Sequence, residues 1–464
     1  MKRLYINILI LAGLSLPLSL PAQETLSLSL DDCREMASAN SFEVKNAVLE
    51  SRSAAALKKE AFTEYFPNVG VVAGGYYAFD PLLNVELKDI LGESSGAQSL
   101  LSMAQAYGIP SSSSFLDYGY NASVTLRQPL YAGGRIVNGN RLASVNLKAA
   151  DLKRAVVVRD NALEVEKKYW RAVSLEEKKL TLEQAICMVD TLSCNVQDAV
   201  AAGLALDTDS LAVSIERNRL QSSMTELRSG IRLAKMDLFD AIGQKYSLLS
   251  FAASEECPFI DDIVLSDRPS SEYGPDIFRV DEVQAASGTA ESGLLALNVD
   301  AAKLQKKMAM GEALPQVGVG VSYGYGRITG DSGRWNGLAF LSVKIPLTDW
   351  WKTSYKMTRL ENDAQKAANE QSRYTELLVL QLRKLWEELS CAYEKVAVAE
   401  SSVSLAMTKA DRISSQYDAG ESTVSDVLAA RTELRQAEDE LTDARIAYMT
   451  SLSEYCARAA AVQE

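Results

Sequence analysis

Residues 316–327 read QVGVGVSYGYGR and alternate strictly between two kinds of side chain. Valine or tyrosine fills every second position from Val317 to Tyr325, and small or polar residues lie between them. Side chains on a β-strand alternate between its faces, so such a strand has one apolar and one small, polar face. Residues 118–127 alternate in the same way. In the stretch 335–345, Leu341 and Val343 oppose Ser342 and Lys344, and residues 69–79 alternate more weakly. Each segment has about the length of a tilted strand that crosses a membrane.

A soluble four-stranded sheet would also show this alternation, but helices would then have to cover its apolar face. The neighbouring helical segments are too long for that, and prolines separate them from the strands, so we expect membrane strands. Four strands cannot close a barrel, and an open edge in lipid leaves backbone N–H and C=O groups unpaired at a cost of several kcal/mol each. Other copies of the chain must therefore complete the sheet. Three copies would give about twelve strands, enough to enclose a water-filled lumen.

Long helical patterns flank these strands. One runs from just after Gly134 to about Ala202, and another runs from about Lys352 to Asp418. Both lengths exceed those of ordinary globular helices and predict coiled-coil packing, although several shorter helices would give a similar pattern.

The sequence also repeats itself. Residues 64–71 (EYFPNVGV) resemble residues 312–319 (EALPQVGV), and Gly203 with the residues after it resembles the stretch that begins at Gly420. Each half runs from a helix through a proline, two strands and a second proline to a long helical hairpin. We therefore predict two internal structural repeats, of which the first carries a long extra loop.

The first residues predict export from the cytoplasm. A basic start at Lys2 and Arg3 is followed by an apolar run over residues 4–20 and a cleavage site after Ala22, as in a secretory signal peptide. A retained transmembrane helix is the alternative, but an apolar run of this length that contains prolines is marginal for spanning a bilayer.

Charge and composition limit the possible functions. The net charge of −13 argues against nucleic acid as a partner, because phosphates would be repelled. Histidine is absent, which removes the usual general base and the commonest transition-metal ligand. We expect no enzyme activity and no cofactor or metal site; the alternative, a carboxylate enzyme, would need acids that converge in a cavity. The spacing of the six cysteines predicts no particular disulfide pairing.

In their order, these features resemble the outer membrane efflux protein family, the TolC-like channels. The motifs that carry the resemblance are residues 30–37 (LDDCREMA), 128–134 (QPLYAGG), 417–420 (YDAG) and 425–431 (SDVLAAR). The resemblance implies a homotrimer in the bacterial outer membrane. Its fold would mix α and transmembrane β: one shared twelve-stranded β-barrel, four strands per chain, above an antiparallel α-helical coiled-coil barrel in the periplasm. It also implies a periplasmic adaptor (membrane fusion) protein and an inner-membrane pump as partners, and export of small molecules or proteins as the function.

With this resemblance, the chain is expected to divide into eight parts. In chain order they are a signal peptide (1–22), a periplasmic helix of the first repeat (23–66), strands 1 and 2 (67–130) with a long extracellular loop (80–116), a helical hairpin (131–248), an inter-repeat linker (249–280), a periplasmic helix of the second repeat (281–314), strands 3 and 4 (315–347), and a second hairpin with the C-terminus (348–464). The opening helix should begin near Asp31, with Asp31 or Asp32 as its N-cap. The long loop is expected either to fold over the pore mouth, to contact a partner, or to be mobile.

The resemblance further implies a gate at the hairpin tips. Asp426 lies at the family's constriction position, where three copies would form a carboxylate ring that favours cations. Ala429 stands where the family often has a second acid, so we expect a single ring. Asp209 is the matching residue of the first hairpin, and Tyr417 resembles a position that can bond across to it. We therefore predict a Tyr417–Asp209 contact that holds the tip shut; the alternative is that these residues only cap helices or lie in solvated turns.

Gly203 and Gly420 are expected to form the turns themselves. Both follow the end of a long helix, where a C-terminal cap needs a positive φ that glycine adopts without strain.

A different function is also open. A coiled-coil surface or adhesive protein could be anchored by a small trimeric β-barrel. Such an anchor should have its strands at one end of the chain, whereas here two strand pairs lie between helices.

Overall fold

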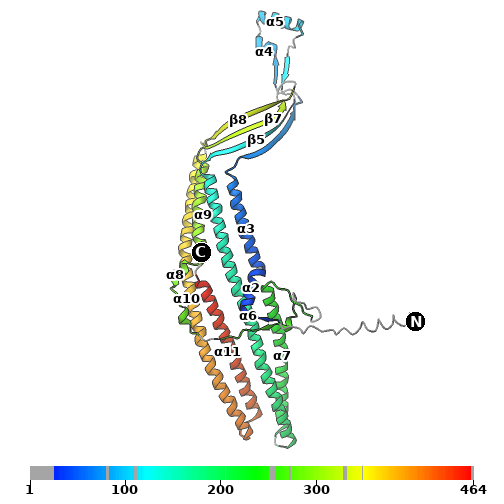
Figure 1. Ribbon diagram of the computed structural model, residues 1–464, viewed down its shortest axis with the longest axis vertical. Coiled ribbons are helices and arrows are strands. Elements are labelled where there is room, and N and C mark those ends of the chain that lie inside the picture. Colours follow the sequence, from blue (N-terminus) through cyan, green and yellow to red (C-terminus); the bar gives the residue numbers. More distant parts are fainter. Residues whose placement is uncertain are drawn as a thin grey trace, which may run out of the picture. The chain divides into compact units, whose positions relative to one another are not determined.

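The computed structural model describes residues 26–79, 83–92, 94–108, 112–115, 118–203, 205–249, 257–270, 273–327, 332–346 and 349–460. The expected signal peptide, residues 1–22, lies outside them. The described chain is mostly helical and contains one four-stranded sheet (Figure 1). It forms two compact units. The hairpin unit comprises Met1–Leu49, Leu152–Gly293 and Tyr374–Glu464, and the sheet unit comprises Glu50–Asp151 and Leu294–Arg373.

The sheet unit contains an antiparallel sheet in the order β2-β5-β7-β8. Its strands are β2 (Asn68–Tyr77), β5 (Tyr118–Ala132), β7 (Gln316–Arg327) and β8 (Arg334–Lys344). All four expected strands are present, and β5 continues five residues beyond the expected end at Arg127. It does so across Pro129, because the register shifts there in a bulge, one of the few places where a central strand tolerates proline.

The segment expected as a loop over residues 80–116 has its own fold where it is described. The short strands β3 (Leu83–Glu86) and β4 (Ser112–Phe115) pair antiparallel, and helices α4 (Leu87–Leu91) and α5 (Ser95–Ala106) lie between them in the chain. Ser94 caps α5 by accepting a hydrogen bond from the Ala97 amide at 3.3 Å.

Helices α3 (Phe42–Thr63), α6 (Arg135–Ala201), α9 (Ala290–Glu312) and α10 (Asp349–Asp418) each contribute one end to the sheet unit. Gly133, just before α6, approaches Gly311 in α9 so closely that a Cβ on Gly133 would lie 2.1 Å from the Gly311 carbonyl oxygen. Gly133 also has a φ of +62°. Glycine at both positions therefore lets α6 and α9 meet backbone to backbone.

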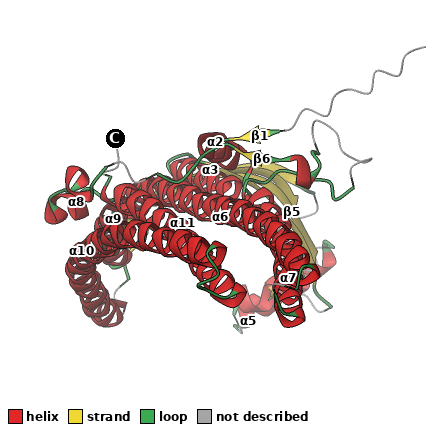
Figure 2. Cartoon of the chain, turned by 90° about the horizontal axis from the view of Figure 1, so that it is seen from below, coloured by secondary structure: helices red, strands yellow, loops and turns green. Residues whose placement is uncertain are grey.

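The hairpin unit contains two long antiparallel pairs, α6 with α7 (Asp207–Ala241) and α10 with α11 (Val424–Ala459). Figure 2 shows these helices foreshortened from below. α6 has 67 residues and α10 has 70, so each is one uninterrupted helix rather than several shorter ones. None of the described helices is long and apolar enough to cross a membrane.

Two helices expected to be continuous are broken. The first of them consists of two helices, α2 (Leu30–Asn40) and α3. The buried Ser41 between them leaves helical geometry, and its hydroxyl bonds the Asn161 side chain at 3.0 Å. The predicted N-cap at Asp31 or Asp32 was wrong: Ser29 is the cap. In the second half, α8 (Glu282–Ser287), capped by Asp281, ends before α9 begins.

The linker expected over residues 249–280 is packed rather than loose where it is described. Its β6 (Val264–Leu265) pairs parallel with β1 (Ser27–Leu28), and it also forms two short 3-10 helices, η2 (Ile260–Asp262) and η3 (Pro275–Phe278). Ile260 and Ile263 enter a core with Tyr169 and Trp170 of α6. The buried Lys235 amino group donates to the Ile263 carbonyl at 2.6 Å. All six cysteines are unpaired.

Candidate functional site

The turn between α10 and α11, here called the second tip (residues 419–423), begins with a Schellman motif. The Gly420 amide donates to the Tyr417 carbonyl at 2.9 Å, and the Glu421 amide donates to the Gln416 carbonyl at 2.8 Å. Gly420 has a φ of +78°, the left-handed conformation that this motif requires. The glycine therefore ends α10 and reverses the chain at once.

Thr423 and Asp426 then start α11 with a capping box. The Asp426 amide donates to Thr423 Oγ1 at 3.2 Å, and Asp426 Oδ2 accepts from the Thr423 amide at 3.0 Å and from its hydroxyl at 2.6 Å. These hydrogen bonds lower the pKa of the exposed Asp426 carboxyl. Oδ1 has no hydrogen-bond partner among the described residues, so Asp426 caps the helix and still presents a charged oxygen to solvent.

The turn between α6 and α7, the first tip (residues 202–206), is similar in its described residues. Gly203 follows α6 with a φ of +74°, and its amide donates to the Val200 carbonyl at 2.9 Å. The half-buried Asp209 accepts from the Leu206 amide at 3.3 Å, which caps α7. A carboxylate near the positive end of each returning helix is a favourable arrangement.

Tyr417 and Asp209 lie near one another but form no hydrogen bond with each other in this part of the structure. Tyr417 is half-buried against an apolar cluster that includes Val424. Burial raises the pKa of the Tyr417 hydroxyl, and the negative charges of Asp209 and Asp418 raise it further. The predicted Tyr417–Asp209 contact therefore has no hydrogen bond among the described residues and stays a prediction.

One apolar cluster, here called the tip cluster, joins both hairpins next to their tips. Ile413 and Tyr417 of α10 pack against it. Its buried members come from α6, α7 and α11: Leu182, Val189, Leu192, Val196, Val213, Leu220, Met224, Val424 and Val427. Separating the two tips would expose these side chains to water, so the cluster favours the associated arrangement.

A row of polar contacts, the α6–α11 ladder, continues this association away from the tips. Asp443 accepts from the Ser174 hydroxyl at 3.0 Å and from the Lys178 amino group at 2.7 Å, and Asp439 accepts from the Thr181 hydroxyl at 3.1 Å. Burial raises the pKa of the Asp439 carboxyl. Sequence reasoning missed these residues, although Asp439 and Asp443 are four apart and so share one helix face.

The sheet has two chemically different faces. Val71, Val124 and Tyr323 are cross-strand partners in one row, and side chains of this face are strongly exposed, including Val71 at 74% and Leu341 at 65%. The opposite face carries rows such as Gly74, Asn121, Gly326 and Arg334. It is not wholly polar, since the Phe340 ring lies against Gly320.

Aromatic rings gather at one end of the apolar face. The Tyr323 and Trp335 rings stack with centroids 5.4 Å apart, and Tyr325 lies beside Trp335 at 5.6 Å. Tyrosine and tryptophan at the end of an apolar band are typical of a membrane interface.

Both outer strands of this sheet have an open edge. Among the residues that the structure describes, β2 pairs only with β5, and β8 pairs only with β7. Each therefore presents a row of backbone N–H and C=O groups that another strand could pair with.

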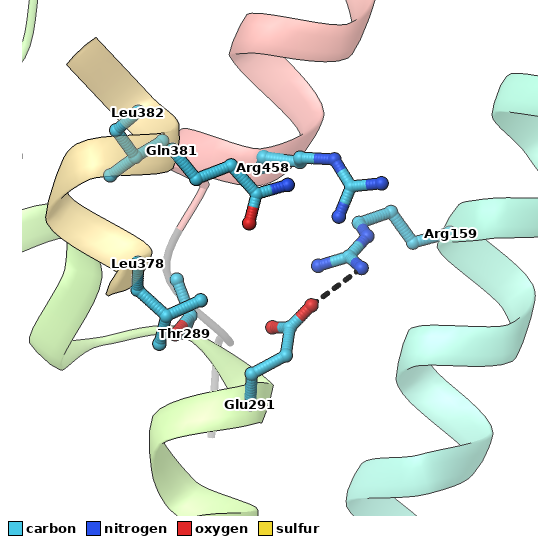
Figure 3. A pocket seen from close by; sticks show the side chains of 7 residues that line it. All are labelled: Arg159, Thr289, Glu291, Leu378, Gln381, Leu382 and Arg458. Atoms are coloured by element: carbon cyan, nitrogen blue, oxygen red, sulfur yellow. Dashed lines mark hydrogen bonds and ion pairs between the residues drawn. The ribbon is translucent and has the colours of Figure 1, made fainter. Parts of the chain in front are cut away.

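The hairpin unit contains a small cavity lined by Arg159, Glu291 and Arg458 among others (Figure 3). Arg159 and Arg458 approach Glu291 there, and Arg159 donates to Glu291 at 2.7 Å. Burial would raise the pKa of Glu291, but the hydrogen bond from Arg159, a backbone hydrogen bond and the charges of both arginines outweigh burial and lower the pKa. The cavity has room for about one water molecule. Among the described residues no group of three or more acidic or cysteine side chains could hold a metal ion.

Comparison with known proteins identifies this architecture. Residues 294–454 match the family described as outer membrane efflux protein. VceC, an outer membrane protein of Vibrio cholerae, is 15% identical with a TM-score of 0.70, over 93% of this chain and 96% of VceC. A membrane protein of Pseudomonas aeruginosa is 13% identical with a TM-score of 0.74, over 93% of each chain. The Campylobacter jejuni outer membrane channel CmeC is 12% identical with a TM-score of 0.71, over 93% of this chain and 85% of CmeC.

No curated protein sequence matches this chain significantly. The likeness to the solved structures nevertheless extends over almost the whole chain, and the family match covers its later strands and the second hairpin. Residues 294–454 thus match the outer membrane efflux protein family, and the fold of the whole chain is similar to that of the TolC-like channels.

Proposed function

We propose that this protein is a trimeric channel of the bacterial outer membrane and the exit duct of a tripartite efflux or secretion system. The observation that carries the proposal is the four-stranded sheet, which has one exposed apolar face and two open edges. In lipid each open edge would leave backbone groups unpaired at several kcal/mol each. Pairing β8 of one copy with β2 of the next removes every open edge once the ring closes.

Three copies close such a ring with about twelve strands, a number that leaves an aqueous lumen. The apolar face would then contact lipid, and the face rich in glycine and polar residues would line water. The long helices would extend the duct through the periplasm. The solved channels of similar fold come from outer membranes, which supports the same location for this chain.

The hairpin tips would form the gate at the periplasmic end. Asp426 is exposed and its lowered pKa keeps it charged, so three copies would make an anionic ring that favours cations. Asp209 and Tyr417 would line the same end. The tip cluster and the α6–α11 ladder would hold the gate closed, and opening would require the two hairpins to separate.

The chemistry of such a duct is passage rather than bond making, so we infer no enzyme activity and no cofactor. Its partners would be a periplasmic adaptor protein and an inner-membrane pump, which deliver small toxic molecules, drugs or proteins. Outer-membrane lipid would surround the barrel.

Conductance of the purified full chain in a planar bilayer tests the proposal. The unaltered protein should be a trimer in detergent with small conductance. The double variant Asp439→Ala with Asp443→Ala should conduct more, because the α6–α11 ladder is lost. A control, Glu433→Ala with Glu440→Ala, also removes two acidic groups from α11, outside the ladder. Glu433 pairs with Lys409 of α10, within the second hairpin, so the control keeps the ladder between the two hairpins and should leave conductance low.

Two outcomes would contradict the proposal. A well-folded monomer in detergent would refute the shared barrel. A trimer that stays closed in the ladder variant and in Asp426→Ala would favour the anchored surface protein instead.

A further inference from the structure

A basic groove is lined by residues from the segments of three helices of the sheet unit, α3, α6 and α9. Figure 1 labels these three helices. Its volume is about 680 Å³. The residues that carry the inference are Lys58, Phe62 and Tyr65 of the α3 segment, Arg141 of α6, and Lys303 and Lys307 of α9.

The cations of this groove are unpaired. Lys58, Arg141, Lys303 and Lys307 are exposed, and none forms an ion pair or a side-chain hydrogen bond with another described residue. Asp300 is the single carboxylate among the lining side chains. Four like charges around one hollow repel one another, so an anion that enters it would be attracted by all four.

Neighbouring cations of the same unit behave differently. Lys356 pairs with Glu312 at 2.6 Å, and Lys306 pairs with Glu361. Lys306 is adjacent in sequence to Lys307 but lies on the other side of α9, toward α10. Lysines between α9 and α10 thus form ion pairs with glutamates, whereas the lysines of the groove form no ion pair with another described residue.

Three of the cations lie at one level. Lys58 is ten residues before β2 begins, Arg141 is nine residues after β5 ends, and Lys307 is nine residues before β7 begins. Five or six of these residues are helical in each case, so at a rise of 1.5 Å per residue each cation lies about 8 Å from the end of its helix nearest the sheet. A lysine or arginine side chain can reach back several ångströms toward a membrane surface, so these charges can meet groups just outside the apolar layer.

Aromatic side chains lie between this level and the sheet. Phe62 is 55% exposed, and Tyr65 lies next to the start of β2. Val137 of α6 adds apolar surface at the same end. The end of the groove nearest the sheet is therefore apolar and the cations lie beyond it, with the apolar Val145 and Leu304 still farther from the sheet. The order of apolar surface followed by cations matches a molecule with an apolar body and an anionic head.

We propose that the basic groove binds the phosphate-bearing headgroup of an anionic membrane lipid, with the acyl chains directed toward the sheet. Juxtamembrane clusters of lysine and arginine recognise such headgroups, and tyrosine favours the same interface. This inference rests on the proposed function, because it requires the sheet to lie in a membrane.

Native mass spectrometry of the purified full-length protein tests the inference, with phosphatidylglycerol as the anionic probe and phosphatidylethanolamine as the zwitterionic one. The test variant combines Lys58→Gln, Arg141→Gln and Lys307→Gln. The control combines Arg52→Gln, Lys59→Gln and Arg359→Gln, which removes the same charge from exposed, unpaired cations of the sheet unit outside the groove.

The unaltered protein should retain phosphatidylglycerol in preference to phosphatidylethanolamine. Each groove cation removed should weaken binding roughly fivefold, so the test variant should lose on the order of a hundredfold in affinity. The control should bind as the unaltered protein does.

Three results would overturn the inference. Equal loss in the control variant would reveal general charge attraction. Equal retention of both lipids would show that the groove does not recognise the net negative charge of the headgroup. Competition by soluble glycerol phosphate as strong as by the lipid would assign the groove to a dissolved anion. Conductance measured on the same samples separates the two proposals, since a conducting trimer that retains no lipid refutes only this one.

Discussion

Asp426 has two roles in the proposed gate, and the chain contains a control that separates them. Ser29 and Asp32 form a second capping box at the start of α2, with the same three distances as Thr423 and Asp426: 3.2, 3.0 and 2.6 Å. Both aspartates are exposed, and in both the cap lowers the pKa. Asp32→Ala therefore removes an equivalent cap at a site that is not at the tips.

The size of the cap effect follows from this shared geometry. Replacing an N-cap serine or threonine by alanine costs about 1 kcal/mol of helix stability. Thr423→Ala and Ser29→Ala should each lower hydrogen-exchange protection of the amides in the first turn of their own helix about fivefold. Thr423→Ala keeps the Asp426 carboxylate, so it should leave cation selectivity almost unchanged.

The decisive assay compares Asp426→Ala with Asp32→Ala in a planar bilayer. Both variants should lose protection in one helical turn, but only Asp426→Ala should reduce cation selectivity and raise the conductance of anions. If Asp32→Ala alters selectivity as strongly, or if Thr423→Ala reproduces the whole effect of Asp426→Ala, the carboxylate ring is refuted and Asp426 only caps α11.

The dependence on pH has a definite sign. The folded-state pKa of Asp426 lies below the usual 3.8, so the contribution of its cap is complete above that value and is lost as the pH falls through the lower, folded-state pKa. Selectivity and tip protection should therefore be the same at pH 7 and pH 5. A loss of selectivity between those two values would contradict the lowered pKa.

Three further predictions test the packing, the sheet faces and the cysteines. Gly243→Ala should destabilise the hairpin unit by more than about 2 kcal/mol in denaturant unfolding, because φ is +68° and a Cβ would lie 2.6 Å from a carbonyl oxygen of α2. Val321→Arg should cost roughly 2–4 kcal/mol at the middle of the apolar face and prevent membrane assembly, whereas Ser322→Arg on the opposite face should assemble. Burial raises the pKa of the Cys33 thiol to about 12, so a maleimide at pH 8 should label the exposed Cys187 and leave Cys33 unmodified until the protein unfolds.

Strong periodicity made the long elements predictable. The helix expected from just after Gly134 to about Ala202 is Arg135–Ala201 in the structure, and the strand expected over residues 316–327 has those bounds. A helix of this length buries one face along its whole extent, and the side chains of a strand alternate between two faces of the sheet with a period of two residues. Both signals are summed over many positions, so no single residue can obscure them.

The errors lie where one side chain decides the structure. Ser41 separates α2 from α3, and its hydroxyl lies within hydrogen-bond distance of Glu43 at 2.6 Å and of Asn161, 120 residues away, at 3.0 Å. Ser29 rather than Asp31 or Asp32 caps α2. Serine and aspartate stabilise a helix N-terminus almost equally, so the cap is determined by where the first helical turn begins. Local preference cannot resolve such choices.

The candidate site was predictable only in part. The positions of Gly203, Gly420 and Asp426 at the tips could be anticipated from turn chemistry and resemblance. The tip cluster and the α6–α11 ladder could not, because they depend on how two hairpins far apart in the sequence face each other. The same holds for the linker, where Ile260 enters a distant core through long-range packing.

The unpaired margins of β2 and β8 have a genetic consequence. A ring of subunits closes only when every β8–β2 interface forms, so one defective copy is enough to leave it open. A copy with a damaged β2 could still pair through its β8 with normal copies and would then inactivate the whole assembly. Alleles that disrupt a single margin should therefore be dominant over the normal gene when both are expressed. Alleles that abolish both margins should be recessive, since their products never join.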